Sequence, residues 1–168
     1  PVFTITGDAE LENLATSFAV GTPGAAGPML AIGSPTRDVG DLDQAGEVLV
    51  VPLAGLSGDL TRGDLPASAI LAGDTAYTRF GHRLAFGDVD GDGDDELWVG
   101  EPWRDATAPA FLVGAAYGFL GGPSFPSGTV APARAAADVV LDETERAAFL
   151  GISFAFPDLD HDGAAELA

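Results

Sequence analysis

The sequence predicts an all-β fold built from many short strands, and three observations lead to it. Glycine and proline, with 23 and 12 residues, interrupt the chain every few positions and leave short apolar stretches between them, which is the pattern of strands joined by tight turns. Hydrophobic residues make up 46% of the 168 positions, enough to bury a sizeable core. The same ordered set of signals also recurs along the chain, which indicates a repeat architecture.

Repeat one occupies residues 1–66. Its apolar stretches, each bounded by turn residues, lie at 3–7, 14–18, 30–35 and 46–51. The loop at 22–27 reads Thr-Pro-Gly-Ala-Ala-Gly and contains no acidic residue. We expect this loop to be held by its own turn residues.

Repeat two, over residues 67–136, is the most complete copy. Its apolar stretches lie at 84–86, 97–99 and 117–120, and a fourth follows at 139–141. Repeat three, over residues 137–168, resumes at 150–156 and is truncated after a second acidic loop. Four strands per repeat are typical of a propeller blade. We therefore predict a partial β-propeller of about two and a half repeats, with four-stranded antiparallel blades.

One succession of motifs resembles a known family. In repeat two, Phe80-Gly81, an acidic loop and Gly100-Glu101-Pro102 follow one another in this order. This succession resembles the FG-GAP repeat of integrin α-subunit propellers. The opening stretch 3–8 is similar to the propeller half of glycosylphosphatidylinositol-specific phospholipases D.

The other repeats depart from that motif. Leu14-Ala15 and Leu150-Gly151 stand where Phe-Gly is expected. Ser34 and Glu101 replace the alanine of Gly-Ala-Pro. These departures weaken the resemblance of single repeats and leave that of the whole set.

Two acidic loops, 88–96 and 158–166, indicate metal binding. Each has carboxylates at positions one, three, five and nine and glycine at position six. Ca²⁺ takes roughly six to eight oxygen ligands, and a tight loop can turn alternate side chains toward one ion. The predicted ligands are Asp88, Asp90, Asp92, the Asp94 carbonyl and Glu96 in the first loop, and Asp158, Asp160, Asp162, the Ala164 carbonyl and Glu166 in the second.

An EF-hand is the rival interpretation of these loops. The EF-hand loop ends at its twelfth position in a bidentate glutamate and leads into a helix. Here the twelfth position is Val99, and the stretch 96–100 is short and apolar, as in a strand. Mg²⁺ is disfavoured because it prefers a strict octahedron that keeps several waters. We therefore predict two Ca²⁺ sites, in loops that join two strands of a blade, and none in repeat one.

The composition excludes several function classes. Acidic residues outnumber basic ones by 26 to seven, which gives a formal net charge of −19 and argues against nucleic acid and anionic membranes as partners. The chain has no cysteine, so disulfides and zinc–thiolate sites are impossible. It also has no apolar run of about 20 residues that could span a membrane.

The remaining single residues offer no catalytic constellation. His82 and His161 lack partners at a zinc or triad spacing. Arg62-Gly63-Asp64 spells the tripeptide that integrins recognise, and chance explains three such common residues. Phe80, Tyr117 and Phe119 are expected to pack in the core. We predict no catalytic residue and expect this chain not to be an enzyme.

The expected function is that of a non-catalytic scaffold. We expect an extracellular or cell-surface module, part of a longer protein, that binds another protein or extracellular ligand through its loops and contacts the remaining blades of its parent chain. One alternative is an accessory propeller of a secreted hydrolase whose catalytic domain lies outside this chain. A further alternative is a propeller whose own face is catalytic.

Overall fold

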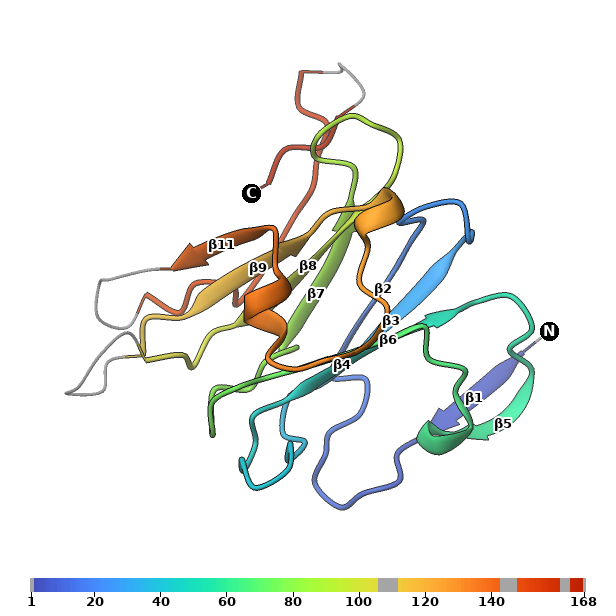
Figure 1. Cartoon of the computed structure of the whole chain (residues 1–168), viewed down its shortest axis with the longest axis vertical. Coiled ribbons are helices and arrows are strands. Elements are labelled where there is room, and N and C mark those ends of the chain that lie inside the picture. Colours follow the sequence, from blue (N-terminus) through green and yellow to red (C-terminus); the bar gives the residue numbers. More distant parts are fainter. Residues whose placement is uncertain (1, 106–111, 143–147, 161–163, 168) are drawn as a thin grey trace.

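The computed structural model describes residues 2–105, 112–142, 148–160 and 164–167, and this part of the chain is all-β, as predicted (Figure 1). Its strands are β1 (Phe3–Thr6), β2 (Ser17–Gly21), β3 (Met29–Ser34), β4 (Glu47–Pro52), β5 (Gly58–Thr61), β6 (Ala69–Ala72), β7 (Arg83–Gly87), β8 (Glu96–Glu101), β9 (Ala115–Phe119), β10 (Gly128–Val130) and β11 (Val139–Asp142). Three short 3-10 helices accompany them: η1 (Arg62–Asp64), η2 (Gly122–Ser124) and η3 (Ala133–Ala136).

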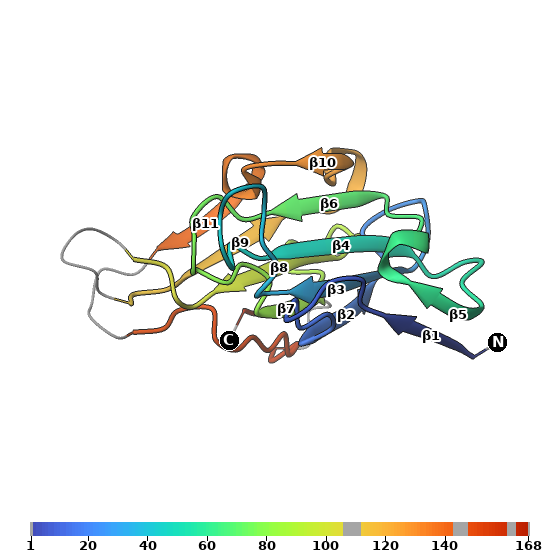
Figure 2. The same cartoon turned by 90° about the horizontal axis from the view of Figure 1, so that it is seen from below.

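The strands form two blades and one strand pair. Blade one contains β2, β3, β4 and β6, joined in antiparallel order. Blade two contains β7, β8, β9 and β11, also antiparallel. Strand β10, which follows β9 in the chain, adds in parallel to the outer edge of β6 in blade one. Strand β1 pairs in parallel with β5. Figure 2 shows this pair beyond the end of blade one.

The inner strands β3 and β8 are buried along their whole length because both faces of a blade are covered. All six residues of β3, Met-Leu-Ala-Ile-Gly-Ser, are buried, as are all six of β8. Antiparallel sheets with one solvated face alternate apolar and polar residues. Continuous burial in β3 and β8 therefore reflects their position between layers.

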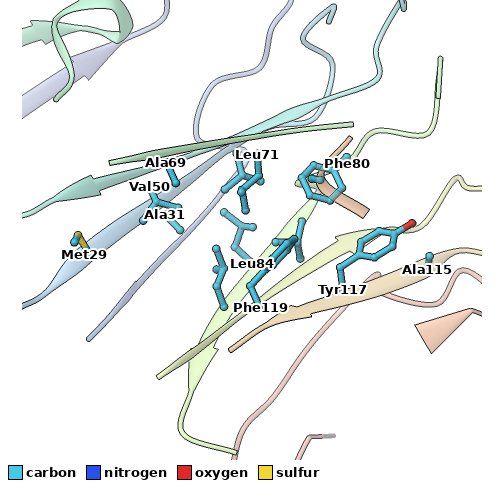
Figure 3. Close-up of a cluster of buried hydrophobic side chains, with 14 residues drawn as sticks. Met29, Ala31, Val50, Ala69, Leu71, Phe80, Leu84, Ala115, Tyr117 and Phe119 are labelled. Carbon is cyan, nitrogen blue, oxygen red and sulfur yellow. The ribbon is translucent and has the colours of Figure 1, made fainter. Parts of the chain in front are cut away.

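The main core lies between the two blades (Figure 3). Val50 and Leu71 of blade one face Leu84, Tyr117 and Phe119 of blade two. Phe80 joins them, and its ring centroid lies 5.7 Å from that of Tyr117. The predicted burial of the three aromatic residues is confirmed.

The glycines of the two repeat motifs meet between consecutive blades. A Cβ atom added to Gly33 would lie 2.2 Å from the carbonyl oxygen of Gly81, and one added to Gly100 would lie 1.9 Å from that of Gly151. Because such distances are far inside van der Waals contact, only glycine fits. The glycine of each of these Gly-x-Pro motifs therefore packs against the Phe-Gly turn, or its Leu-Gly equivalent, of the next repeat.

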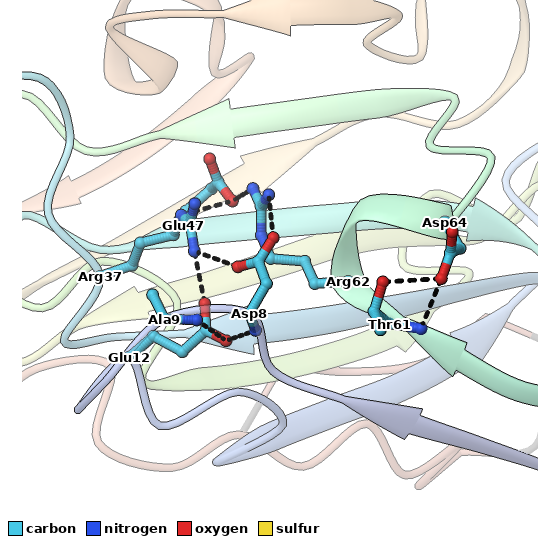
Figure 4. A network of polar contacts seen from close by, with 8 residues as sticks. All are labelled: Asp8, Ala9, Glu12, Arg37, Glu47, Thr61, Arg62 and Asp64. Atoms are coloured by element: carbon cyan, nitrogen blue, oxygen red, sulfur yellow. Dashed lines mark hydrogen bonds and ion pairs between the residues drawn. The ribbon is translucent and has the colours of Figure 1, made fainter.

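Ion pairs join the loops at one end of blade one (Figure 4). In the Arg37 cluster, the Arg37 guanidinium contacts Asp8 at 3.1 Å and also Glu12. Arg62 pairs with Glu47 in the same cluster. In the Arg-Gly-Asp tripeptide, Asp64 accepts hydrogen bonds from the backbone N–H and hydroxyl of Thr61. Both charged ends of the tripeptide thus make internal contacts.

Repeat two carries an equivalent ion-pair cluster, the Arg104 cluster. Arg104 contacts Asp74 at 3.4 Å and Glu101 at 3.1 Å. Asp74 follows β6 as Asp8 follows β1, each after a glycine. The hydroxyls of Thr78 and Tyr117 donate to the Glu101 carboxylate. Repeat one places its buried carboxylate on Glu12, whereas repeat two places it on Glu101.

Candidate metal centre

The first acidic loop joins β7 to β8 and gathers three carboxylates. Oxygen atoms of Asp88, Asp90 and Glu96 all lie within 4.8 Å of one another. Asp88 directly follows β7, and Glu96 is the first residue of β8. The antiparallel pairing of β7 with β8 therefore holds the two ends of the loop together.

Backbone amides within the loop orient these carboxylates. Asp88 accepts hydrogen bonds from the N–H groups of Gly91 at 2.8 Å and Gly93 at 3.0 Å. Asp90 accepts one from the N–H of Asp92 at 3.2 Å. Gly91 has φ +74, a left-handed conformation that side chains disfavour. Hydrogen bonds to its own aspartates thus fix the shape of the loop.

Glu96 is the buried member of the cluster. Its side chain is 1% exposed. One carboxylate oxygen accepts the N–H of Val89 at 2.7 Å, and the other accepts that of Gly121 at 3.2 Å. Burial raises the pKa of Glu96, and the charges of Asp90 and Asp88 raise it further, against the lowering effect of those two N–H groups. A cation at this position would offset the repulsion among the three carboxylates.

The second acidic loop repeats the arrangement. Carboxylate oxygens of Asp158, Asp160 and Glu166 lie within 4.8 Å of one another. Glu166 accepts the N–H of Leu159 at 2.7 Å, which matches the bond from Val89 to Glu96 in length and position. Two loops with the same internal hydrogen bond form the same kind of site.

Asp92 is a further predicted ligand of the first loop. Asp92 accepts the N–H of Asp94 at 2.8 Å, and neither carboxylate belongs to the group of three that the described residues form. Asp162 lies outside the described residues, as does His161. The carbonyls of Asp94 and Ala164 remain predicted ligands.

Contacts between loops of consecutive repeats were not predicted. Asp95 accepts the N–H of Thr22 at 2.6 Å, and its own N–H donates to the Thr22 carbonyl at 3.0 Å. Between the next two repeats, the N–H of Ala165 donates to the Asp88 carbonyl at 2.7 Å. Figure 1 shows the loops of repeats two and three beside each other, at the same end of the blades. Thr22 and Asp88 hold equivalent positions in their repeats. The sequence could have indicated that their carbonyls make the same contact, but only once the repeats are superposed.

The donor set fits a hard divalent cation. All three clustered side chains in each loop offer carboxylate oxygens, the ligands that Ca²⁺ prefers. The cluster contains no nitrogen or sulfur donor among the described residues, so a zinc-type ligand set is not present there. Asp88, Asp90 and Glu96 would hold such an ion in the first loop, with Asp158, Asp160 and Glu166 in the second.

Comparison with known protein families assigns the central part of the chain. Residues 80–130 match the model of the FG-GAP repeat. Residues 80–130 are an FG-GAP repeat. This stretch starts at Phe80, contains the first acidic loop and ends with β10. The FG-GAP repeat therefore covers the turn that packs on blade one, three strands of blade two and the parallel strand that returns to blade one.

One curated relative supports this assignment. The phosphatidylinositol-glycan-specific phospholipase D of Bos taurus is 32% identical over 124 residues, which cover 67% of this chain. The match covers 14% of that relative's length, so the chain corresponds to a small part of it. No helix among the described residues has the length and apolar character needed to cross a membrane.

Proposed function

We propose that this chain is a calcium-binding, non-catalytic FG-GAP propeller module of an extracellular protein, in which the ions stabilise the β7–β8 loop and its counterpart in repeat three. The observation that carries this proposal is the clustering of three carboxylates in each of two equivalent loops, with oxygens within 4.8 Å of one another. In blade two, such an ion would join the end of β7 to the start of β8.

Electrostatics supports a structural role for the ion. Three carboxylates that meet without a cation repel one another, and Glu96 is also removed from water. Binding of a divalent cation to the folded loop stabilises the native state by mass action. At a free concentration about 100 times Kd, each site contributes about 2.7 kcal/mol.

The test is a Ca²⁺ titration by calorimetry, with a thermal melt in Ca²⁺ and in chelator. We expect two sites with Kd of about 10⁻⁴–10⁻³ M, the range of extracellular modules. For a chain of this size, the melting temperature should rise by about 2–4 °C per kcal/mol gained. Asp90→Ala combined with Asp160→Ala should abolish both the binding heat and the shift.

Asp41→Ala is the matched control, because Asp41 is an exposed aspartate outside both loops. This variant should bind Ca²⁺ as the unsubstituted chain does. Unchanged melting in chelator, together with no binding heat in the unsubstituted chain, would refute the proposal. The loops would then be solvated acidic turns.

A binding role follows from what the rigid loops offer. Loops held on a rigid scaffold carry recognition in many folds, and the loop end of this module has acidic, metal-binding character. We propose another protein or an extracellular ligand as the partner. Calcium at about millimolar concentration outside cells would occupy roughly half or more of such sites, which is the reason for proposing an extracellular location.

The match to a phospholipase D supports a second candidate. In that case the chain would be an accessory propeller of a secreted hydrolase whose catalytic domain lies elsewhere in the protein. A hydrolysis assay on the parent protein and on this chain alone would separate the two candidates. Activity confined to the parent protein would favour the accessory role, and activity in this chain would refute its non-catalytic assignment.

A further inference from the structure

A small pocket lies where the first strands of consecutive repeats meet. It has a volume of about 300 Å³, and Ser17, Arg83 and Ser153 line it. These residues hold the same position in their repeats, each three residues after the phenylalanine or leucine of the Phe-Gly motif. Ser17 begins β2 and Arg83 begins β7. The pocket therefore lies at the other end of these strands from the loops 22–27 and 88–96.

Arg83 is an arginine of the pocket without a carboxylate partner among the described residues. Four other arginines each form an ion pair: Arg37, Arg62, Arg104 and Arg134. Arg83 instead donates from its Nε to the carbonyl of Ile152 at 3.1 Å. No described residue accepts a hydrogen bond from the terminal nitrogens of Arg83, and the residue is exposed. These nitrogens are therefore available to a ligand.

The neighbouring repeats indicate that the fold does not need an arginine at this position. Ser17 is 6% exposed, and its hydroxyl accepts the N–H of Leu84 at 2.8 Å. A serine thus makes the contact between the first strands of blades one and two. At the next junction, Arg83 reaches the Ile152 carbonyl with Nε alone. The rest of the guanidinium group exceeds what the junction requires.

The lining of the pocket favours a ligand that joins a carboxylate to an apolar group. The planar guanidinium presents paired N–H donors that match the two oxygens of a carboxylate. The hydroxyl of Ser153, an exposed residue, can donate to the same group. Phe18 and Phe154 add apolar surface to the pocket. Among the described residues, none that lines the pocket is acidic.

The charge near this end of β7 is positive, although the whole chain carries −19. Burial lowers the pKa of His82, and the charges of Arg83 and Arg79 lower it further. Arg79 lies over the ring of Trp103 at 4.7 Å and forms no ion pair with a described carboxylate. At physiological ionic strength, exposed charges more than about 8 Å apart are largely screened. An anion in the pocket therefore meets the charge of Arg83 more strongly than the net charge of the chain.

We propose that this pocket binds a small organic carboxylate, whose charged group contacts Arg83 and whose apolar part lies against the phenylalanine side chains. Its volume of about 300 Å³ is at the lower end of small-molecule sites. At roughly 3.4 Å per strand residue, Arg83 lies about 17 Å from Asp88. The site uses none of the predicted calcium ligands. It therefore goes beyond the proposed calcium-binding function and does not rest on it.

A titration with benzoate tests this proposal, because benzoate joins a carboxylate to an apolar ring. Proton–nitrogen NMR spectra of the chain follow the Nε–H of Arg83 and the backbone N–H groups of Leu84 and Ser153. We expect saturable shifts with a Kd of about 1–10 mM, as for a ligand of this size. Benzyl alcohol keeps the ring and lacks the charge, so it should bind at least about tenfold more weakly.

The repeats themselves supply the matched variants. Arg83→Ser copies the residue of the two neighbouring repeats and should weaken benzoate binding at least about tenfold. Arg83→Gln, which keeps most of the side chain and loses its charge, should show the same loss. Arg79→Asn is the control, because it removes one positive charge near the pocket and copies Asn13 of repeat one. Both Arg79 and Asn13 have positive φ, +59 and +49, which asparagine tolerates. This variant should bind benzoate within about twofold of the unsubstituted chain.

Three outcomes would overturn the proposal. The first is the absence of saturable shifts up to about 100 mM benzoate, ten times the weakest expected Kd. The second is equal affinity of the unsubstituted chain and a folded Arg83→Ser or Arg83→Gln variant. The third is tighter binding of sulfate than of benzoate at the same amides, which would identify a site for a tetrahedral anion. None of these outcomes would alter the result of the calcium titration, so the two proposals fail independently.

Discussion

The equivalence of the two ion-pair clusters can be tested by moving a buried carboxylate. In repeat two this carboxylate is moved to the position that the buried carboxylate occupies in repeat one. Glu101 is 1% exposed and accepts a hydrogen bond from Thr78 at 2.6 Å. Repeat one has Glu12 at the position of Thr78 and Ser34 at that of Glu101. The double variant Thr78→Glu with Glu101→Ser therefore copies one cluster into the other.

Each single change should be costly. Glu101→Ser removes the carboxylate that contacts Arg104 at 3.1 Å and receives the Tyr117 hydroxyl. Removing one partner of a buried ion pair costs roughly 3–5 kcal/mol, and we expect about 3 kcal/mol because Arg104 keeps Asp74 at 3.4 Å. Thr78→Glu alone places a second carboxylate beside Glu101, so like charges meet in a buried space.

The double variant should recover much of this loss. We expect a coupling free energy of about 2 kcal/mol or more, because the introduced glutamate would face Arg104 as Glu12 faces Arg37. Urea unfolding followed by tryptophan fluorescence measures the four free energies of the cycle. Glu101→Gln is the control that keeps the shape and removes the charge. Losses that add within about 0.5 kcal/mol would refute the equivalence.

Three further changes test other parts of the structure. Gly100→Ala should destabilise the chain by at least about 2 kcal/mol, measured by urea unfolding, because the new methyl group meets the Gly151 carbonyl at 1.9 Å. Phe80→Ala should cost roughly 3–5 kcal/mol in the same assay, and a loss below 1 kcal/mol would contradict its burial. Burial, with Arg83 and Arg79 nearby, lowers the pKa of His82. Protonation then favours the unfolded chain, so stability should fall as pH drops below the usual histidine pKa of about 6.5. His82→Gln should remove that part of the pH dependence in melts between pH 5 and pH 8, roughly the window in which histidine titrates.

The sequence was sufficient for the fold class because its signals are local. Turn residues, strand-length apolar stretches and a repeated order of motifs predicted four-stranded blades, and the strands of blade two coincide closely with the stretches 84–86, 97–99, 117–120 and 139–141. Burial of Phe80, Tyr117 and Phe119 also followed from residue type alone.

The contacts between repeats were beyond sequence reasoning. Neither β5 nor β10 has strong strand character, and each pairs in parallel with a strand that lies far before it in the chain. The exchange between Glu12 and Glu101 appears only when the two clusters are compared in space. The alternation in the first acidic loop left Asp95 out of the ligand set but gave no sign that it contacts Thr22.

The metal prediction was partly within reach of the sequence. The alternation of aspartates in residues 88–96 led to Asp88, Asp90 and Glu96, whose carboxylates do lie together. Asp92 was assigned by the same alternation; its carboxylate accepts the N–H of Asp94, and its role as a ligand stays a prediction.

Strand β10, at the outer edge of blade one, comes from the following repeat. The unit that recurs in the sequence and the unit that folds as a sheet are therefore out of phase along the chain. Gain or loss of one whole repeat leaves each junction with the same kind of strand partner on either side. In a gene that grows by duplication, such an offset would let the number of blades change while every interior sheet stays complete.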